Sequence, residues 1–144
     1  MTKVLVVQAR FYEQIADELV SGASKALKSA RVDFDVMEVP GAFEIPGAIS
    51  IAAESGIYDG FVALGCVIRG ETTHYDYVAG ESARALMDLS LEGVALGNGI
   101  LTVENSEQAM VRAQVDKKNK GADAANACLR MIEVRNQLLS DLDE

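Results

Sequence analysis

The stretch Lys3-Val4-Leu5-Val6-Val7-Gln8 decides the fold class, because its four central residues are apolar without a break. A strand with consecutive apolar side chains must bury both faces, which is typical of a parallel sheet covered on both sides. Gly60 to Gly65 is a second apolar stretch and predicts another such strand. Further strands are expected at Val32–Val39 and Val94–Val103, and the glycines of the latter, at 97 and 99, predict an irregular strand.

Helical periodicity fills the segments between these strands. Apolar residues recur every fourth position over Tyr12–Ala30, at Ile15, Leu19, Ala23 and Leu27. Asn105 followed three residues later by Gln108 resembles a capping box and predicts the start of a short helix. Other helices are expected at Pro46–Glu54, at Tyr77–Leu91 and, after the charged loop Lys117–Gly121, at Ala122–Leu139.

Strands and helices therefore alternate, and we expect all the strands, including 32–39, to be buried on both faces. This combination predicts an α/β fold: a three-layer α/β/α arrangement with a parallel sheet of about four strands and helices on both faces. We expect one domain over residues 1–144. Ligands of such sheets bind beyond the carboxyl ends of the strands. That rule directs attention to three loops: Ala9–Tyr12, Pro40–Pro46 and Cys66–Tyr75.

Composition excludes several classes of protein. A net charge of −9 argues against nonspecific nucleic-acid binding. The sequence contains no GxGxxG and no GxxxxGK[ST], which argues against dinucleotide and nucleoside-triphosphate sites. Cys66 and Cys128 form no CxxC pair, so we expect buried free thiols.

The two ends of the sequence carry their own expectations. The first residues run into a strand without a basic-then-apolar leader, and we expect a soluble, cytoplasmic protein. The acidic residues Asp141, Asp143 and Glu144 predict a solvated tail.

The third loop is the most informative about chemistry. Its Gly70-Glu71-Thr72-Thr73 segment lies just before a helix, where free amides and the positive end of the helix dipole favour phosphate. An ordinary turn capped by one of the threonines is an equally good interpretation. His74, the only histidine, follows directly, and an imidazole can give and take protons near neutral pH. No second histidine or cysteine lies nearby in sequence to complete a metal site.

The other two loops offer aromatic surfaces. Phe43 and Phe11 could each lie against a flat ring, and Glu44 could accept hydrogen bonds from ligand hydroxyls. The alternatives are that both rings fill the core and that Glu44 favours a helix N-terminus.

Three segments together resemble the lumazine synthase family: residues 39–46, residues 65–77 with the run RGETTHYDY, and Asn119-Lys120-Gly121. The resemblance spans almost the whole chain. It implies a flavodoxin-like fold and a transferase that condenses a ribitylamino-uracil with dihydroxybutanone phosphate, releases phosphate and forms a lumazine. It implies no metal and no organic cofactor. A noncatalytic flavin- or lumazine-binding paralogue, or an assembly scaffold, is the alternative.

The resemblance also implies roles for individual residues. Phe11 would stack on the pyrimidine, and His74 would transfer protons. The pyrimidine and ribityl site would comprise Ala42, Phe43, Glu44, Val67 and Ile68. The phosphate group would contact Glu71, Thr72, Thr73 and Arg112. Lys120 would reach the pyrimidine side of the site. A neighbouring subunit of a homo-oligomer would supply Asn98, Arg112 and Lys120.

Two positions and one loop depart from the family pattern. Asn98 stands where many members carry phenylalanine, and Tyr12 stands where many carry asparagine. The loop Gln114–Lys118 lacks the glycine of members that close into icosahedral shells. We therefore expect a pentamer or a pair of pentamers.

Overall fold

The computed structural model describes residues 1–140, so the predicted acidic tail lies outside the described residues. Four parallel strands form one sheet in the order β2-β1-β3-β4. The strands are β1 (Lys3–Ala9), β2 (Asp33–Val39), β3 (Gly60–Ile68) and β4 (Leu96–Val103). The helices are α1 (Glu13–Ser29), the short 3-10 helix η1 (Ala42–Glu44), α2 (Ile45–Glu54), α3 (His74–Leu91), α4 (Ser106–Ala113) and α5 (Lys120–Ser140).

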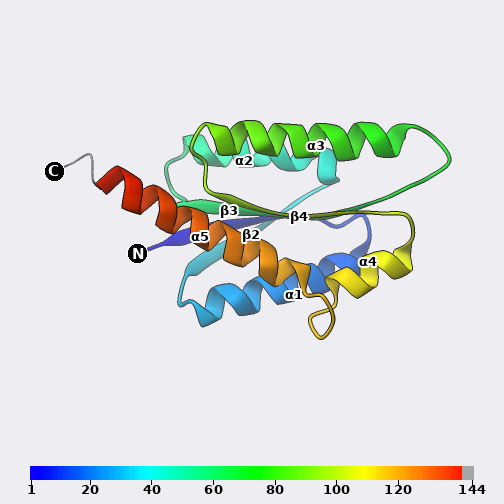
Figure 1. Ribbon diagram of the computed structural model, residues 1–144, viewed down its shortest axis with the longest axis horizontal. Helices are drawn as coiled ribbons and strands as arrows, with labels where there is room; N and C mark the ends of the chain where they lie inside the picture. Colours follow the sequence, from blue (N-terminus) through cyan, green and yellow to red (C-terminus); the bar gives the residue numbers. More distant parts are fainter. Residues whose placement is uncertain (141–144) are drawn as a thin grey trace.

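The helices cover both faces of the sheet. Figure 1 shows α2 and α3 on one side, and α1, α4 and α5 on the other. The predicted α/β fold with a parallel four-stranded sheet between helical layers is therefore confirmed. Within residues 1–140, no helix combines the length and the apolar character needed to cross a membrane.

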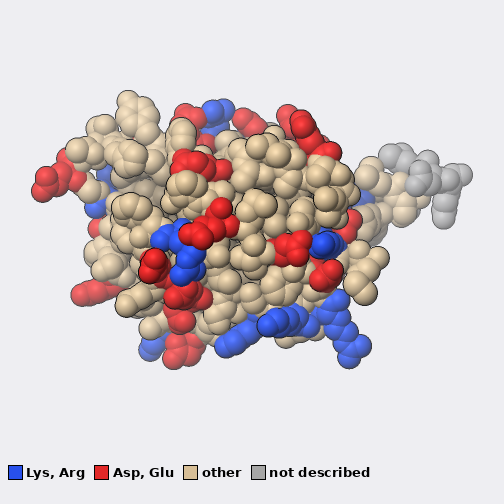
Figure 2. All heavy atoms as spheres, turned by 180° about the vertical axis from the view of Figure 1, so that it is seen from behind, with Lys and Arg blue, Asp and Glu red and all other residues tan. Residues whose placement is uncertain are grey.

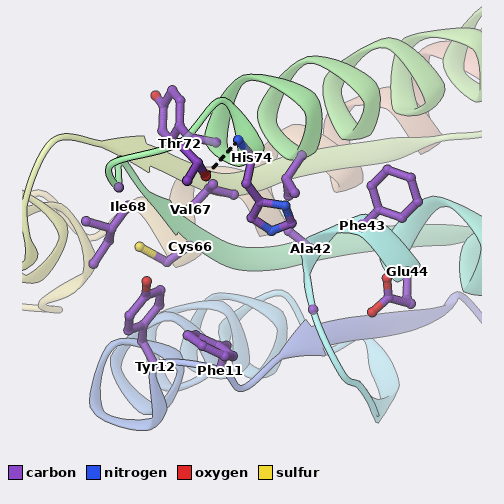
Figure 3. A pocket seen from close by; sticks show the side chains of 14 residues that line it. Phe11, Tyr12, Ala42, Phe43, Glu44, Cys66, Val67, Ile68, Thr72 and His74 are labelled. Carbon is purple, nitrogen blue, oxygen red and sulfur yellow. Dashed lines mark hydrogen bonds between the residues drawn. The ribbon is translucent and has the colours of Figure 1, made fainter.

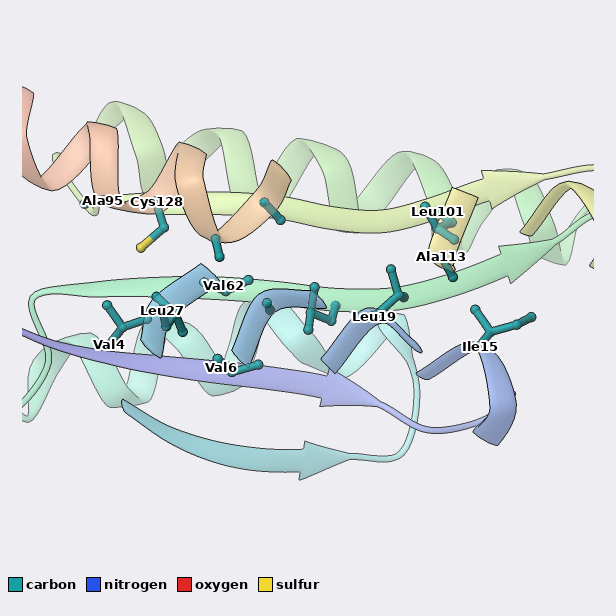
Figure 4. Close-up of a cluster of buried hydrophobic side chains, with 14 of the residues drawn as sticks. Val4, Val6, Ile15, Leu19, Leu27, Val62, Ala95, Leu101, Ala113 and Cys128 are labelled. Carbon is teal, nitrogen blue, oxygen red and sulfur yellow. The ribbon is translucent and has the colours of Figure 1, made fainter. Parts of the chain in front are cut away.

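The two central strands supply the middle of both cores. Val4 and Val6 of β1 point to the α1 side, whereas Leu5 and Val7 point to the α2 side, and none of the four is more than 1% exposed. Figure 4 shows the first of these cores, in which α1 contributes Leu19 and the other residues of its predicted apolar stripe. Full burial of one such side chain stabilises the fold by about 1.5–3 kcal/mol.

The surface contributes less to stability. Figure 2 shows acidic side chains spread over one face, several of them beside basic ones. Arg84 with Glu81, and Arg130 with Glu133, are ion pairs whose side chains are at least 49% exposed. Exposed pairs of this kind contribute only about 0–1 kcal/mol each, so the two cores dominate.

Four predictions about individual elements need correction. The segment 32–39 is not a strand buried on both faces, because β2 lies at the sheet edge and exposes Val36 and Met37. The strand predicted to end at Gly65 runs on to Ile68, because β4 provides pairing partners that far. α3 begins at His74 and not at residue 77, and α5 begins at Lys120 inside the predicted charged loop. The other boundaries agree within two residues, and the capping box is confirmed by a 2.9 Å hydrogen bond from Gln108 N to Asn105 Oδ1.

The prediction of an irregular strand around Gly97 and Gly99 is wrong. β4 pairs with β3 without interruption from Leu96 to Val103. The glycines instead make room for α5: a Cβ atom on Gly97 would overlap the carbonyl oxygen of Ala124, and one on Gly99 would lie 3.0 Å from the Ala124 Cβ. Glycine is therefore required here for close packing of a helix against a regular strand.

This packing predicts that Gly97→Ala destabilises the protein by about 1–3 kcal/mol, the usual cost of overpacking a core. Gly80→Ala is the matched control, because Gly80 lies within α3 and its Cβ would meet no atom within 4 Å. The control should be neutral or stabilising by up to about 1 kcal/mol. Urea unfolding at equal protein concentration measures both changes, and equal midpoints for the two variants would contradict the packing argument.

Candidate functional site

A cavity of about 380 Å³ lies at the carboxyl edge of the sheet, where the connections after β1, β2 and β3 meet. The strand order reverses between β1 and β3, and open α/β sheets bind ligands at such a switch point. The residues lining the cavity are Phe11, Tyr12, Gly41, Ala42, Phe43, Glu44, Cys66, Val67, Ile68, Gly70, Thr72, His74, Tyr75 and Val78. The three loops singled out from the sequence therefore do converge.

His74 enters the cavity from the first turn of α3. Figure 3 shows its imidazole ring directed between Val67 and Ala42. Thr73 occupies the N-cap position without a side-chain cap, and the His74 amide donates to Thr72 Oγ1 at 3.3 Å. The alternative prediction, a turn with a threonine at the helix N-cap, is therefore correct for the position of Thr73, although the Thr73 side chain makes no cap hydrogen bond. It leaves the helix N-terminus with Gly70 and Thr72 facing the cavity, so a phosphate seat is still compatible with it.

The two phenylalanines are not core residues. Phe11 is 76% exposed and Phe43 is 57% exposed, although both line the cavity. Glu44 is the N-cap residue of α2 but makes no side-chain cap hydrogen bond, so its carboxylate is available to the cavity. Two exposed rings around one cavity form surfaces against which a planar ligand can stack.

Burial makes two ionisable groups of the cavity harder to deprotonate. Desolvation raises the pKa of the half-buried Cys66 thiol to about 11 and also raises the pKa of Tyr12. Neither group is a base at neutral pH. Among the lining side chains, the imidazole of His74 and the carboxylate of Glu44 are left as the groups suited to proton transfer.

The structure adds residues that sequence reasoning missed. Gly41, Cys66, Tyr75 and Val78 line the cavity but were not predicted as site residues. The sequence places Cys66 in the third loop but predicts only a buried free thiol there, whereas the half-buried Cys66 lines the cavity. Conversely, Glu71 and Thr73 are exposed and lie beside the cavity without lining it.

Asn98, Arg112 and Lys120 line a different cavity, of about 420 Å³, on the open edge of β4 between α4 and α5. Asn98 Oδ1 accepts from the Ile100 amide at 2.9 Å, and Arg112 Nη1 donates to the Gln108 carbonyl at 3.0 Å. Lys120 Nζ lies 3.6 Å from Asp123 Oδ2. Arg112 and Lys120 give this cavity a basic side that the first cavity lacks.

Within residues 1–140, the two cavities share no lining residue. The chain therefore brings Phe11, Phe43 and His74 together, and it separately brings Arg112 and Lys120 together. It does not bring the two groups to each other.

Comparison with known proteins adds independent evidence. A family model described as 6,7-dimethyl-8-ribityllumazine synthase matches residues 1–136. A 6,7-dimethyl-8-ribityllumazine synthase of Novosphingobium aromaticivorans is 56% identical over 95% of this chain and 99% of its own length. A protein of the same name from Zymomonas mobilis subsp. mobilis is 54% identical over 96% of this chain and 99% of its own length. Another, from Methylorubrum populi, is 57% identical over 93% of this chain and 83% of its own length.

The raised pKa of Cys66 predicts how its alkylation depends on pH. With a pKa of about 11, the thiolate fraction and hence the rate should rise about tenfold per pH unit between pH 8 and 10. Peptide mass spectrometry after short exposure to iodoacetamide measures this rate, with the fully buried Cys128 as an internal comparison. A rate that levels off below pH 9 would contradict the prediction.

Proposed function

Because the chain belongs to the 6,7-dimethyl-8-ribityllumazine synthase family, we propose that it condenses 5-amino-6-(D-ribitylamino)uracil with 3,4-dihydroxy-2-butanone 4-phosphate. The products are 6,7-dimethyl-8-ribityllumazine, inorganic phosphate and water, and the reaction is the penultimate step of riboflavin biosynthesis. One domain, residues 1–144, carries the activity. The observation that best supports it is the cavity that His74 lines together with two exposed aromatic rings.

The pyrimidine occupies the half of the cavity that follows β1 and β2. Phe11 and Phe43 supply stacking surfaces, because their rings are exposed in the chain and line the cavity. Ala42 lines the same cavity, and Glu44 accepts hydrogen bonds from ribityl hydroxyls. Val67 and Ile68, the last residues of β3, offer backbone groups to the edge of the ring.

The phosphorylated ketone occupies the half beside the N-terminus of α3. Backbone amides of Glu71 and Thr72 donate to the phosphate, with Thr73 next to them at the helix N-cap. The N-terminus of an α-helix favours anions through its free amides and its dipole. Arg112 supplies the positive charge that completes this seat.

The chemistry requires no nucleophile from the protein. The 5-amino group of the pyrimidine attacks the ketone carbonyl, and water leaves to give an imine. Elimination then releases phosphate, and attack by the ribitylamino nitrogen followed by loss of a second water closes the ring. Holding the two reactants together can contribute about 7–11 kcal/mol to catalysis. His74 gives and takes the protons of these steps, while Arg112 stabilises the charge on the departing phosphate.

The complete site is assembled from two subunits. His74 lies in one cavity and Arg112 in another, so a neighbouring copy has to bring its Asn98, Arg112 and Lys120 to the first cavity. A contact between two different surfaces of the same chain repeats head to tail, and it forms a ring where the rotation between neighbours closes. The family resemblance gives the ring as a pentamer, and the absence of a glycine from Gln114–Lys118 favours single or paired rings.

Incubation of the purified protein with both substrates tests the activity directly. A rise in lumazine fluorescence that requires both substrates, with release of phosphate, supports the proposal. Retention of a flavin or lumazine without turnover would instead support a noncatalytic binding paralogue, and assembly without either property would support a scaffold.

Replacement of the proton-transfer group is expected to slow the reaction without abolishing it. His74→Ala should lower kcat by about 10²-fold, the low end for general acid–base catalysis, because the attacking amine is already nucleophilic. His74 is exposed at the start of α3, so thermal stability should hardly change. Steady-state kinetics measures the effect, and an unchanged kcat would remove His74 from the mechanism.

Replacement of the phosphate ligand is expected to act on one substrate only. Loss of a charged hydrogen bond costs about 1.5–3 kcal/mol, so Arg112→Ala should lower the affinity for the phosphorylated ketone by about 10- to 150-fold. Arg130→Ala is the matched control, because Arg130 lines neither cavity and pairs with Glu133 on its own helix. If Arg112→Ala lowered the affinity for both substrates equally, Arg112 would not be the phosphate ligand.

A further inference from the structure

Arg69 joins three segments at the edge of the cavity. It is the first residue after β3, and its amide donates to the Val103 carbonyl at 2.9 Å. Its Nε atom lies 3.2 Å from Glu104 Oε1 and 3.1 Å from Glu104 Oε2. Its guanidinium carbon lies 4.2 Å from the centre of the Tyr75 ring, and Nη1 lies 3.5 Å from Asp76 Oδ1.

These contacts close the loop that carries the proposed phosphate seat. Residues 70–74 run from Arg69 to Tyr75, so the stacking of the guanidinium on the ring fixes both ends of the loop. Gly70, Thr72, His74 and Tyr75 line the cavity, whereas Arg69 itself does not. The side chain of Arg69 therefore holds the loop from outside.

Glu104 anchors this arrangement to the neighbouring strand. It follows β4 directly and precedes Asn105, the N-cap residue of α4. The Glu104 amide donates to Gln108 Oε1 at 2.8 Å, so the backbone of Glu104 is held by the start of α4. Through Glu104, Arg69 couples the α3 N-terminus to a fixed point on the sheet.

Neither stability nor direct phosphate binding accounts for these contacts. The side chains are 43–60% exposed, and ion pairs at such exposure stabilise a fold very little. The guanidinium faces two carboxylates, so the cluster carries a net charge of −1 and is not itself attractive to phosphate. What the cluster does provide is a fixed geometry for the loop between a planar guanidinium fork and an aromatic ring.

We propose that Arg69 is a positioning residue that acts through Glu104 and Tyr75 to fix the Gly70–Thr73 turn and His74 for the phosphorylated substrate. The proposal rests on the proposed function. A misplacement of about 1 Å, caused by a mutation that removes no ligand contact, can cost up to about 10²-fold.

The variants Arg69→Gln, Glu104→Ala and the corresponding double variant test this role. Calorimetry with inorganic phosphate gives Kd, and steady-state kinetics gives KM for each substrate and kcat. Each single variant should raise the phosphate Kd and the KM of the ketone by about tenfold. The double variant should show the same Kd and KM as the single variants, because the same Arg69–Glu104 ion pair is lost in every case. The KM of the pyrimidine should stay within about twofold, since its proposed side-chain contacts lie on other loops and the backbone of Val67 and Ile68 is held by pairing with β4.

If Arg69 were instead a direct phosphate ligand, Glu104→Ala would have the opposite effect on phosphate binding. Glu104→Ala would then free the guanidinium and remove a negative charge, so phosphate would bind more tightly, and this result would overturn the positioning role. Arg69→Lys keeps the charge but not the planar fork. It should therefore also weaken phosphate binding, and a wild-type Kd in this variant would contradict the proposal.

Arg84→Gln is the matched control. Arg84 also contacts two carboxylates, Glu81 at 2.6 Å and Asp88 at 3.1 Å, but both lie on its own helix. This variant should leave Kd, both KM values and the melting temperature unchanged, and a loss equal to that of Arg69→Gln would overturn the proposal. The phosphate Kd is independent of turnover, so a wild-type protein that binds phosphate but makes no lumazine would contradict the proposed function while this test still stands.

Discussion

Burial of β1 and β3 on both faces is the constraint on which the rest of the structure depends. Alternate residues of β1, such as Val6 and Val7, enter opposite cores, so helices have to cover both sides of the sheet. Parallel strands then require that every strand-to-helix connection leaves from the same edge. Phe11, Phe43 and His74 meet at that edge although more than sixty residues separate the first from the last.

The same constraint divides the proposed site residues between two surfaces of one chain. β4 lies at the end of the sheet, and α4 and α5 pack beside it on the α1 side, so Arg112 and Lys120 open onto a different surface. One surface therefore offers aromatic rings and an imidazole, whereas the other offers cations. A reaction between a planar pyrimidine and a phosphorylated ketone needs both, which is why the proposed function and the proposed ring of subunits depend on each other.

Local pattern was sufficient to predict much of this arrangement. The apolar strands, the stripe of α1 and the capping box depend on neighbouring residues, and the three converging loops follow from a general rule for parallel sheets. Errors arose where distant parts of the chain decide the outcome. Pairing with β4 extends β3 to Ile68, and packing of α5 explains Gly97, which local pattern read as an irregularity. Likewise, only the fold shows that Arg69 reaches Glu104.

The central claim is that each active site combines His74 of one subunit with Arg112 of the next. Reassembly of His74→Ala subunits with Arg112→Ala subunits tests it most directly, with lumazine formation at a ketone concentration far below KM, where each variant alone is slow, as the readout and mass spectrometry to verify mixed rings. In a random ring, about one quarter of the interfaces combine an intact His74 with an intact Arg112. The account predicts that about a quarter of the wild-type activity returns. Verified mixed rings that stay as slow as the separate variants would contradict it.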